Sequence, residues 1–413
     1  MKRILERCAG LDVHKKELTA CRLVPRPQNA TVSEVMTFGT MTKELLALVD
    51  WLKQGGCTHV AMESTGVFWK PVFNLLEGEF EVLLVNPREV KQVPGRKTDT
   101  GDAAWLAELL QCGLLKGSFI PPAPQRQLRD LTRYRTTLVQ ERARILNRLQ
   151  KVLEDANIKL ASVVSDIDGV SARMMLQTIL AGETNVTFLA ELAKGRLREK
   201  RAELEQALTG LMKEHHRFLI AEHLSHMDYL EEAIARVSAE IKERLRPFQL
   251  ESDLLDSSPG INLRIAEIIL AEIGPNPFPT FEDAKHLASW AGMCPGNQQS
   301  AGKRLSGKTR KGCAALKSAL VEAAHGAAKT KNTYLSAQYH SLVRRIGKKK
   351  ALVAVGHSIL IAVYHILTRK EPYHELGPRY LDELRRPQRI RRHVRCLEQF
   401  GFEVVLKPLP AAA

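Results

Sequence analysis

The sequence lacks the features by which several protein classes are recognised. Its seven cysteines are scattered and form no CxxC pair, which argues against a zinc site or a disulfide framework and fits a reducing cytoplasm. The N-terminus is too charged and too short to be a secretory signal. The longest apolar stretch, residues 351–368, is interrupted by His357 and His365, which favours a buried helix over a membrane span.

Aromatic residues and acidic charge are also scarce. Phe, Trp and Tyr make up only 6% of the chain, so stacking of single-stranded bases on aromatic rings is not favoured. Lys and Arg outnumber Asp and Glu by 61 to 46, which gives a net charge of +15. A charge of this sign predicts a polyanionic partner, most simply nucleic acid. A chain of 413 residues can bury more than one core, so two or three domains are expected.

Residues 1–118 alternate strand-like and helix-like segments, the pattern of an α/β domain. Four carboxylates lie in it. Asp12 lies in the first strand-like run, Glu63 ends the run 59–63, and Asp99 and Asp102 stand three residues apart where an amphipathic helix begins. Such positions can converge on one point of an open sheet, where four acidic groups would repel one another unless hard divalent cations neutralised them. Two-metal phosphoryl transfer uses this arrangement.

These acids also have simpler interpretations. Asp99 could cap the helix that starts near Gly101, and Asp102 could favour its positive end. Asp12 fits that interpretation less well, because a charge inside a buried strand is costly without a partner. A lone Asp after an apolar run also occurs in sugar kinases, but these need a glycine-rich phosphate loop that the sequence does not show. His14 would face the same side of the strand as Asp12. It could assist metal or phosphate binding, but an accessory structural role is the favoured interpretation.

Other segments of the N-terminal domain have regular patterns. Strand-like composition and helical spacing are both present between the carboxylates. The strand-like segments are residues 9–14, 18–24, 59–63 and 80–85, and the helical ones are residues 42–53 and 68–76.

A long helical arm is expected over residues 119–250, after a proline-rich hinge at residues 121–124. Residues 125–158 look continuously helical, with Leu131, Leu138, Ile145 and Val152 seven apart. Apolar residues between 227 and 241 alternate spacings of three and four, as a coiled-coil seam requires. The seam could pair within the chain as an antiparallel hairpin or with another chain.

The composition changes again from Ser257. Residues 259–274 combine a Pro-Gly loop, an apolar helix and a glycine stop, which loosely resembles a helix-hairpin-helix module that offers loop amides to a DNA phosphate. A short loop and helix without a ligand is an equal alternative. Residues 281–291 predict another helix. The segment 295–312 holds glycines, small polar residues and dense positive charge, which predicts an exposed loop near phosphates.

Basic charge dominates the C-terminal part of the chain. Between residues 297 and 350, thirteen Lys or Arg stand against one acidic residue, which favours nucleic acid over an ordinary solvated surface. Six arginines between residues 385 and 395 make the tail, residues 378–413, a possible DNA or RNA clamp. The predicted nucleic-acid contacts are Lys97, Lys303, Arg304, Lys308, Arg310 and Lys311.

Ser300 in the glycine-rich segment is a candidate nucleophile. A serine hydroxyl is a poor nucleophile unless a base or a metal activates it, and no Ser-His-Asp order is apparent. Ser306, in the same segment, is nearly indistinguishable on these grounds.

Five short motifs follow one another in the order of a known family. They are Gly-Leu-Asp-Val-His-Lys at residues 10–15, Met-Glu-Ser-Thr-Gly at 62–66, Val-Asn-Pro at 85–87, Lys-Thr-Asp-Thr-Gly-Asp-Ala at 97–103, and Ala-Gly-Met-Cys-Pro at 291–295 with Gln299-Ser300. In these motifs and their order, over roughly residues 8–370, the chain resembles the insertion-sequence 110 family of DEDD transposases, also called bridge-RNA-guided recombinases.

The resemblance implies a fold of class α/β plus α. Its parts would be a RuvC-like catalytic domain of the RNase H fold over residues 1–118, a coiled-coil arm over 119–250, a mainly helical transposase domain over 251–377 and the basic tail. It also implies that Asp12, Glu63, Asp99 and Asp102 bind Mg²⁺, two ions in each composite site. Ser300 would attack the DNA phosphate and form a covalent phosphoserine intermediate.

The resemblance further implies a composite site, in which one protomer's RuvC-like domain meets another's transposase domain in a homo-oligomer, a dimer or a tetramer. The implied partners are donor DNA, target DNA and a structured guide RNA, the bridge RNA, whose loops pair with both DNAs. The expected location is the bacterial cytoplasm, at the nucleoid when bound to DNA, with no membrane partner.

Two other functions remain open on the sequence. A RuvC-like nuclease or junction resolvase would use the same four acids with water as the nucleophile and would form no protein–DNA adduct. A basic DNA- or RNA-binding scaffold would use the acids only structurally and would show no turnover.

Overall fold

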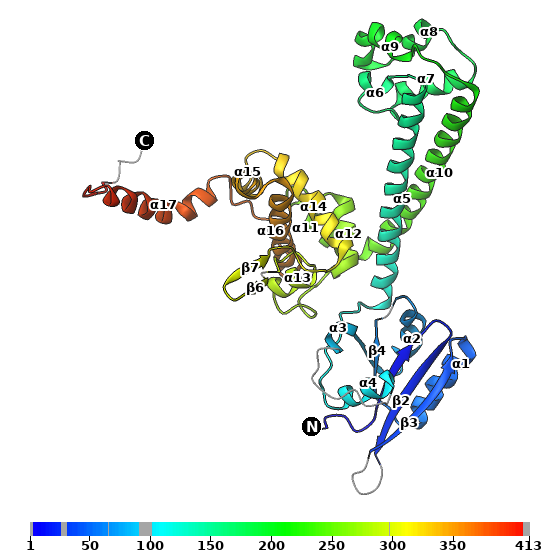
Figure 1. Cartoon of the computed structure of the whole chain (residues 1–413), viewed down its shortest axis with the longest axis vertical. Helices are drawn as coiled ribbons and strands as arrows, with labels where there is room; N and C mark the ends of the chain where they lie inside the picture. Colours follow the sequence, from blue (N-terminus) through cyan, green and yellow to red (C-terminus); the bar gives the residue numbers. More distant parts are fainter. Residues whose placement is uncertain (1–2, 26–30, 65, 91–100, 297, 408–413) are drawn as a thin grey trace. The chain divides into compact units, whose positions relative to one another are not determined.

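The computed structural model describes residues 3–25, 31–64, 66–90, 101–296 and 298–407. The chain divides into two compact units, Met1–Ile120 and Pro121–Ala413, called unit 1 and unit 2 (Figure 1). The division falls at the start of the proline-rich segment that the sequence marks as a hinge. Unit 1 is an α/β unit and unit 2 is mainly helical, in agreement with the expected α/β plus α class.

Unit 1 is built on a mixed sheet whose described strands follow the order β3-β2-β1-β4-β5. β1 pairs antiparallel with β2 and β2 pairs antiparallel with β3, whereas β4 runs parallel to both of its neighbours, β1 and β5. Helices connect the parallel strands, as crossover connections require. The strands are β1 (Cys8–Val13), β2 (Glu17–Pro25), β3 (Thr31–Gly39), β4 (His59–Glu63) and β5 (Glu81–Val85).

Helices cover both faces of this sheet. α1 (Thr42–Gln54) and α2 (Trp69–Leu76) pack on the face that buries Leu11 and Met62. α4 (Asp102–Gln111) packs on the opposite face, over Cys8 and Ala61, and α3 (Pro87–Val90) is a single turn after β5. Because side chains alternate along a strand, Cys8, Gly10 and Asp12 of β1 all face α4.

The sequence predicts four of these strands to within one residue, and α1 and α2 equally well, but it misses β3. β3 is an edge strand, and most of its side chains are exposed or half-buried. Polar residues are therefore tolerated on both of its faces, so the strand shows no alternation of apolar and polar residues.

Unit 2 begins with a long helical hairpin. α5 (Ala123–Asp155) and α10 (Glu214–Leu245) pack against each other within one chain, so the chain forms the antiparallel hairpin by itself. Of the predicted heptad residues of α5, Leu138 and Ile145 are buried, whereas Leu131 and Val152 are half-buried.

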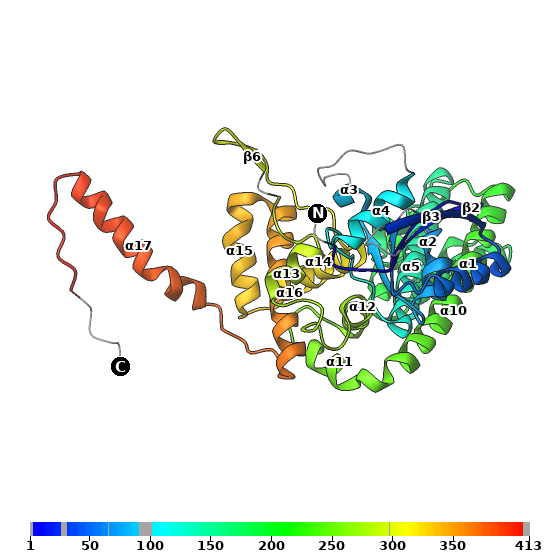
Figure 2. The same cartoon turned by 90° about the horizontal axis from the view of Figure 1, so that it is seen from below.

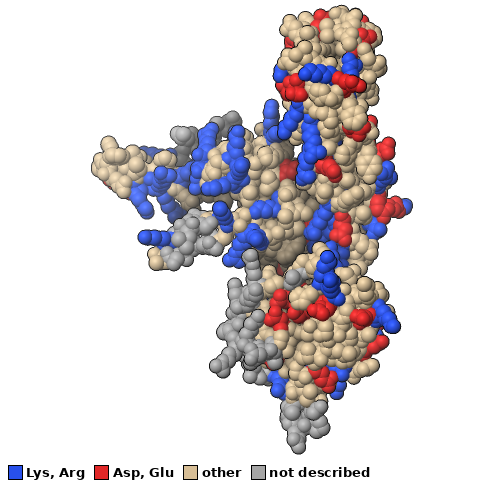
Figure 3. Space-filling model, turned by 45° about the vertical axis from the view of Figure 1, so that its right-hand side comes forward, with Lys and Arg blue, Asp and Glu red and all other residues tan. Residues whose placement is uncertain are grey.

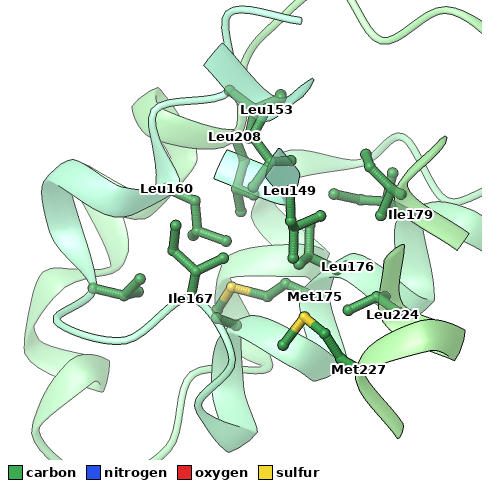
Figure 4. Close-up of a cluster of buried hydrophobic side chains, with 14 of the residues drawn as sticks. Leu149, Leu153, Leu160, Ile167, Met175, Leu176, Ile179, Leu208, Leu224 and Met227 are labelled. Carbon is green, nitrogen blue, oxygen red and sulfur yellow. The ribbon is translucent and has the colours of Figure 1, made fainter. Parts of the chain in front are cut away.

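A group of short helices forms a cap at the far end of this hairpin. Figure 4 shows the shared core, in which Leu149 and Leu153 of α5 meet Leu176 of α7, Leu208 of α9 and Met227 of α10. The sequence predicts a helical arm here but not this cap, because residues 158–213 carry no long periodic run. The helices of the cap are α6 (Leu160–Val163), α7 (Val170–Leu180), α8 (Val186–Glu191), the 3-10 helix η1 (Gly195–Lys200) and α9 (Arg201–Leu208).

The remaining helices of unit 2, apart from α17, form a bundle around α16. By length and composition alone α16 could cross a membrane, but 56% of its apolar stretch is buried, and it packs against α11, α13, α14 and α15. The elements are the 3-10 helix η2 (Arg246–Phe248), α11 (Gln249–Asp256), α12 (Leu263–Ile273), α13 (Ala284–Trp290), β6 (Gln298–Ser300), β7 (Lys303–Ser306), α14 (Ala314–Lys329), α15 (Tyr334–Ile346), α16 (Lys348–Arg369) and α17 (Tyr380–Gln399).

Local signals explain several helix ends in the bundle. The Asn262 side chain caps α12 by accepting from the N–H of Ile265 at 3.0 Å, and Gly274 ends this helix with φ 81°, as the glycine stop predicts. α13 begins later than residue 281 because Asp283 caps it, accepting from the N–H of His286 at 2.8 Å.

A buried charge cluster joins the arm to the bundle. Arg133 of α5 donates two hydrogen bonds to the Glu272 carboxylate of α12, at 2.7 and 2.9 Å, and Glu272 is fully buried. The Cys313 thiol, directly before α14, donates to the same carboxylate at 3.2 Å, and burial together with Glu272 raises the pKa of this thiol. Arg135 and Glu267 form a second buried pair between α5 and α12. Because breaking a buried ion pair leaves a charge without compensation, these contacts fix the root of α5 on the bundle.

Candidate active site and nucleic-acid interface

Asp12 and Glu63 are neighbours at the carboxyl-terminal ends of two parallel strands. Leu11 of β1 pairs with Met62 of β4 in the parallel register, so the next residue on each strand is Asp12 and Glu63. Adjacent strands lie about 4.8 Å apart, and side chains at one register level point to the same face. Both carboxylates therefore belong to the face that α4 covers.

Gly10 allows α4 to lie directly on β1. A Cβ atom at this position would fall 2.2 Å from the carbonyl oxygen of Ala103 and 2.5 Å from the amide nitrogen of Ala107. The helix and the strand run in opposite directions, since the Cys8 thiol donates to the carbonyl of Ala107 at 3.6 Å, towards the end of the helix. The start of α4, with Asp102 in its first turn, therefore lies at the end of β1 where Asp12 stands.

The structure thus brings Asp12, Glu63 and Asp102 to one edge of the sheet, on one face. Asp99 and Lys97 lie outside the described residues. The N-cap of α4 is Gly101, and Asp102 in the first turn also interacts favourably with the positive end of the helix, as the simpler interpretation of this residue expects.

Asp12 is accessible from solvent. Its side chain is 29% exposed, and Nε2 of His14 lies 3.2 Å from one of its carboxylate oxygens, so the two side chains share one side as the sequence predicts. The three described acids offer only oxygen donors. Hard cations such as Mg²⁺ prefer such ligands and keep several waters, so a partly exposed carboxylate edge fits this ion.

A second group of possible metal ligands is present among the described residues, at the tip of the arm. It consists of Asp155, His215 and His216. Nδ1 of His216 accepts from the backbone N–H of Lys213 at 3.2 Å, which leaves Nε2 protonated to donate to Asp155 at 2.9 Å. This hydrogen bond holds the pKa of Asp155 below its ordinary value. Both ring nitrogens of His216 are therefore in use, Nδ1 at the N-terminus of α10 and Nε2 in joining α10 to α5, which does not fit a metal ligand.

Ser300 lies at the tip of a β-hairpin, in the segment for which the sequence predicts an exposed loop. It is the last residue of β6 and pairs with Lys303 of β7 across the two-residue turn Ala301-Gly302. The turn residues have φ of 47° and 75°, the left-handed values of a type I′ turn, which matches the twist of a hairpin. The side chains of Ser300, Arg304 and Ser306 lie outside the described part of the chain.

Close packing holds the base of this hairpin. The Lys317 ammonium of α14 donates to the carbonyl of Gly292 at 3.3 Å and to the Thr309 hydroxyl. A Cβ atom on Gly312 would lie only 2.3 Å from the amide nitrogen of Gly292. Glycines at these two positions let the segments before and after the hairpin cross, which explains the glycine of the 291–295 motif.

Four of the predicted phosphate contacts are exposed around the hairpin: Lys303, Lys308, Arg310 and Lys311. On the face shown in Figure 3, Lys and Arg side chains gather over the helical bundle of unit 2, and few acidic side chains lie among them. The described part of this surface is therefore positively charged, as binding to a phosphate backbone requires.

Two residues that shape these regions were missed by the sequence analysis. Gly10 has a usable signal, because an isolated glycine inside a strand indicates close approach of another backbone. Glu272 has a weaker one. It is an acidic residue in the otherwise apolar end of α12, so its burial required a cationic partner, but the sequence did not identify Arg133 as that partner.

Comparison with known proteins agrees with the geometry. A family model for DEDD transposases of the IS110 type, described as a transposase, matches residues 9–158, and a model described as the transposase IS116/IS110/IS902 family matches residues 252–340. Together the two matches cover more than half of the chain. The transposase for insertion sequence element IS1111A of Coxiella burnetii (strain RSA 493 / Nine Mile phase I) is 23% identical over 295 residues, 70% of this chain and 72% of the relative.

The predicted site residues fall inside the matched segments, the four acids in the first and Ser300 in the second. The carboxylate edge, the serine hairpin and these matches lead to one conclusion: the chain is a DNA transposase and belongs to the IS110 family of insertion-sequence transposases.

Proposed function

We propose that this transposase cleaves and exchanges DNA strands in a Mg²⁺-dependent reaction guided by a structured RNA, with Ser300 as the nucleophile. The observation that carries the proposal is the convergence of Asp12, Glu63 and Asp102 at one edge of the sheet. The strand order β3-β2-β1-β4-β5, with its antiparallel and parallel halves, supports an RNase H-like, RuvC-like identity for residues 1–118.

In this proposal Asp12, Glu63, Asp99 and Asp102 hold Mg²⁺, two ions in each site. Bound Mg²⁺ would neutralise charge on the DNA phosphate and lower the pKa of the attacking hydroxyl. The chain's own contribution is to hold its carboxylates in position. Gly10 sets the spacing between α4 and β1, and His14 orients the carboxylate of Asp12.

Ser300 then acts by transesterification. Its Oγ forms a bond to the phosphorus and gives up its proton, while the bond from phosphorus to one bridging deoxyribose oxygen breaks and that oxygen takes up a proton. A hydroxyl of the other DNA then attacks the same phosphorus and releases the serine. The exposed hairpin tip suits a composite site, in which Ser300 of one protomer meets the carboxylates of another in a dimer or tetramer.

The exposed cations of the hairpin region supply phosphate contacts for donor DNA, target DNA and the guide RNA. Sequence recognition by base pairing with the guide RNA suits a protein whose charge is directed at phosphates rather than bases. The RNA, the oligomer and the cytoplasmic location are carried over from the family resemblance.

The test combines the full-length protein, the flanking non-coding RNA, labelled donor and target DNA, and Mg²⁺ on a denaturing gel. We expect a protein-linked DNA band that disappears in Ser300→Ala and persists in the matched variant Ser306→Ala. Asp12→Asn should abolish strand exchange and leave RNA binding intact. An adduct that survives Ser300→Ala but not Ser306→Ala would reassign the nucleophile. Cleaved DNA with no linked protein would instead indicate the water-using nuclease.

A further inference from the structure

α17 (Tyr380–Gln399) lies beyond both matched segments, and among the described residues its root makes contacts with the bundle. The Tyr380 ring packs edge-on against Tyr334 at 5.6 Å, and the Arg385 guanidinium donates to the Ser341 hydroxyl of α15 at 3.1 Å. Among the residues of α17, Leu381 is the buried one. The helix extends away from the bundle (Figure 2), and its side chains from Arg386 onwards are exposed or half-buried.

The exposed part of α17 is dense in arginine. Arg385, Arg389 and Arg392 follow one another at spacings of four and three, so they share one face of the helix, and Arg386 borders it. Like charges at these spacings destabilise an isolated helix. The acidic residues of α17 lie near its two ends, and one of them, Asp382, pairs with Arg389 at 2.8 Å. These arginines therefore do not stabilise the helix by themselves. Their density is explained by binding to an anion outside the chain.

A neighbouring helix extends the same basic surface. Arg344 and Arg345 of α15 follow Ser341, the contact of Arg385, by three and four residues, and both are exposed. They consequently lie on the side of α15 that faces the root of α17. The arginines of α15 and α17 therefore begin on the two sides of the contact between Arg385 and Ser341.

We propose that α17 binds duplex DNA along its phosphate backbone, seated at the major groove, through protein contacts that need no guide RNA. The major groove of B-form DNA admits an α-helix, whereas that of A-form RNA is too deep and narrow. A helix of twenty residues is about 30 Å long and is exposed around most of its circumference, so it can enter such a groove. The inference rests on the proposed function only in taking DNA as the substrate.

The test measures binding of the full chain to a labelled DNA duplex at a series of salt concentrations, without guide RNA and without Mg²⁺. The variant is Arg386→Gln with Arg389→Gln and Arg392→Gln, because glutamine retains helix propensity. A matched control removes the same charge from exposed positions on the cap of the arm: Lys194→Gln, Arg196→Gln and Arg201→Gln. Far-ultraviolet circular dichroism checks that both variants remain folded.

We expect the slope of log affinity against log salt to fall by about 0.9 for each lost phosphate contact, hence by about 2.7 in the α17 variant. At 0.1 M salt, relative to 1 M, this corresponds to a loss of affinity of about five hundredfold. The control variant should retain the slope of the parent protein.

Three results would overturn the inference. The first is a change of slope in the α17 variant that is no larger than the change in the control. The second is an equal loss on an RNA duplex of the same sequence, which would remove the assignment to a B-form groove. The third is loss of binding to anionic lipid vesicles with DNA binding retained, because a basic amphipathic helix also suits a membrane surface. The binding assay needs neither Ser300 nor Mg²⁺. It therefore tests the role of α17 even if the adduct experiment shows that Ser300 is not the nucleophile.

Discussion

Replacing Gly10 with alanine tests whether the spacing between β1 and α4 positions the carboxylates. The new Cβ atom would lie 2.2 Å from the carbonyl oxygen of Ala103, within the backbone of α4 rather than against a flexible side chain. Ordinary contact distances require the helix to retreat by about 1 Å. Because Asp102 immediately precedes Ala103, this retreat carries its carboxylate away from Asp12 and Glu63.

The expected size of the effect follows from this displacement. Overpacking of a core costs about 1–3 kcal/mol, which in a domain of this size lowers the Tm by roughly 5–15 °C. A displacement of about 1 Å at a reacting centre costs about a hundredfold in rate. At 25 °C the Gly10→Ala protein should therefore remain largely folded, whereas its rate of strand transfer should fall about a hundredfold.

Thermal unfolding and a strand-transfer gel, run on the same preparations, measure the two effects. Gly78→Ala is the matched control, because no heavy atom lies within 4 Å of a Cβ atom at that position. It should retain both Tm and activity. Parent-like strand transfer by Gly10→Ala would refute the reasoning, since α4 would then have no role in placing Asp102.

Three further predictions concern other parts of the molecule. Glu272→Gln should lower the free energy of unfolding by about 3–5 kcal/mol in urea titrations, because the carboxylate that compensates the charge of Arg129, whose side chain is only 12% exposed, is lost, and an unchanged midpoint would contradict this. Burial lowers the pKa of His357 from its ordinary 6.5, so the unfolded chain takes up that proton first as the pH falls. The Tm should therefore decrease below pH 6.5, and less steeply in His357→Gln, as calorimetry can measure. The thiol of Cys396 is exposed, whereas burial raises the pKa of Cys8 to about 12, so mass spectrometry after alkylation at pH 8 should find Cys396 modified first.

The sequence predicted the parts of the fold that repeat a pattern. β1, β2, β4 and β5 were found because their apolar runs are buried on at least one side, whereas β3 at the sheet edge carries no such run. The cap of the arm was missed for a related reason, since its core is assembled from five short helices and from the ends of α5 and α10 rather than from one periodic segment.

The sequence predicted which acidic residues belong to the candidate site, but it did not predict how they are arranged in space. Nothing in the sequence states that Asp12 and Glu63 are register neighbours, because register is decided by the pairing of β1 with β4. The hairpin was missed because its turn uses Ala301 with a positive φ, a position where glycine or asparagine is the usual signal.

The carboxylate of Glu272 has a mechanical consequence. It accepts hydrogen bonds from Arg133, near the root of the arm, and from Cys313, at the exit of the segment that carries Ser300. Rotating α5 without moving that segment withdraws the guanidinium groups of Arg129 and Arg133 from a fully buried carboxylate. Leaving that charge without compensation costs about 3–5 kcal/mol, so fewer than roughly one molecule in a hundred is uncoupled at any moment. The arm is therefore rigidly coupled to the bundle at its root. A force applied to the far end of the arm is transmitted to the serine hairpin.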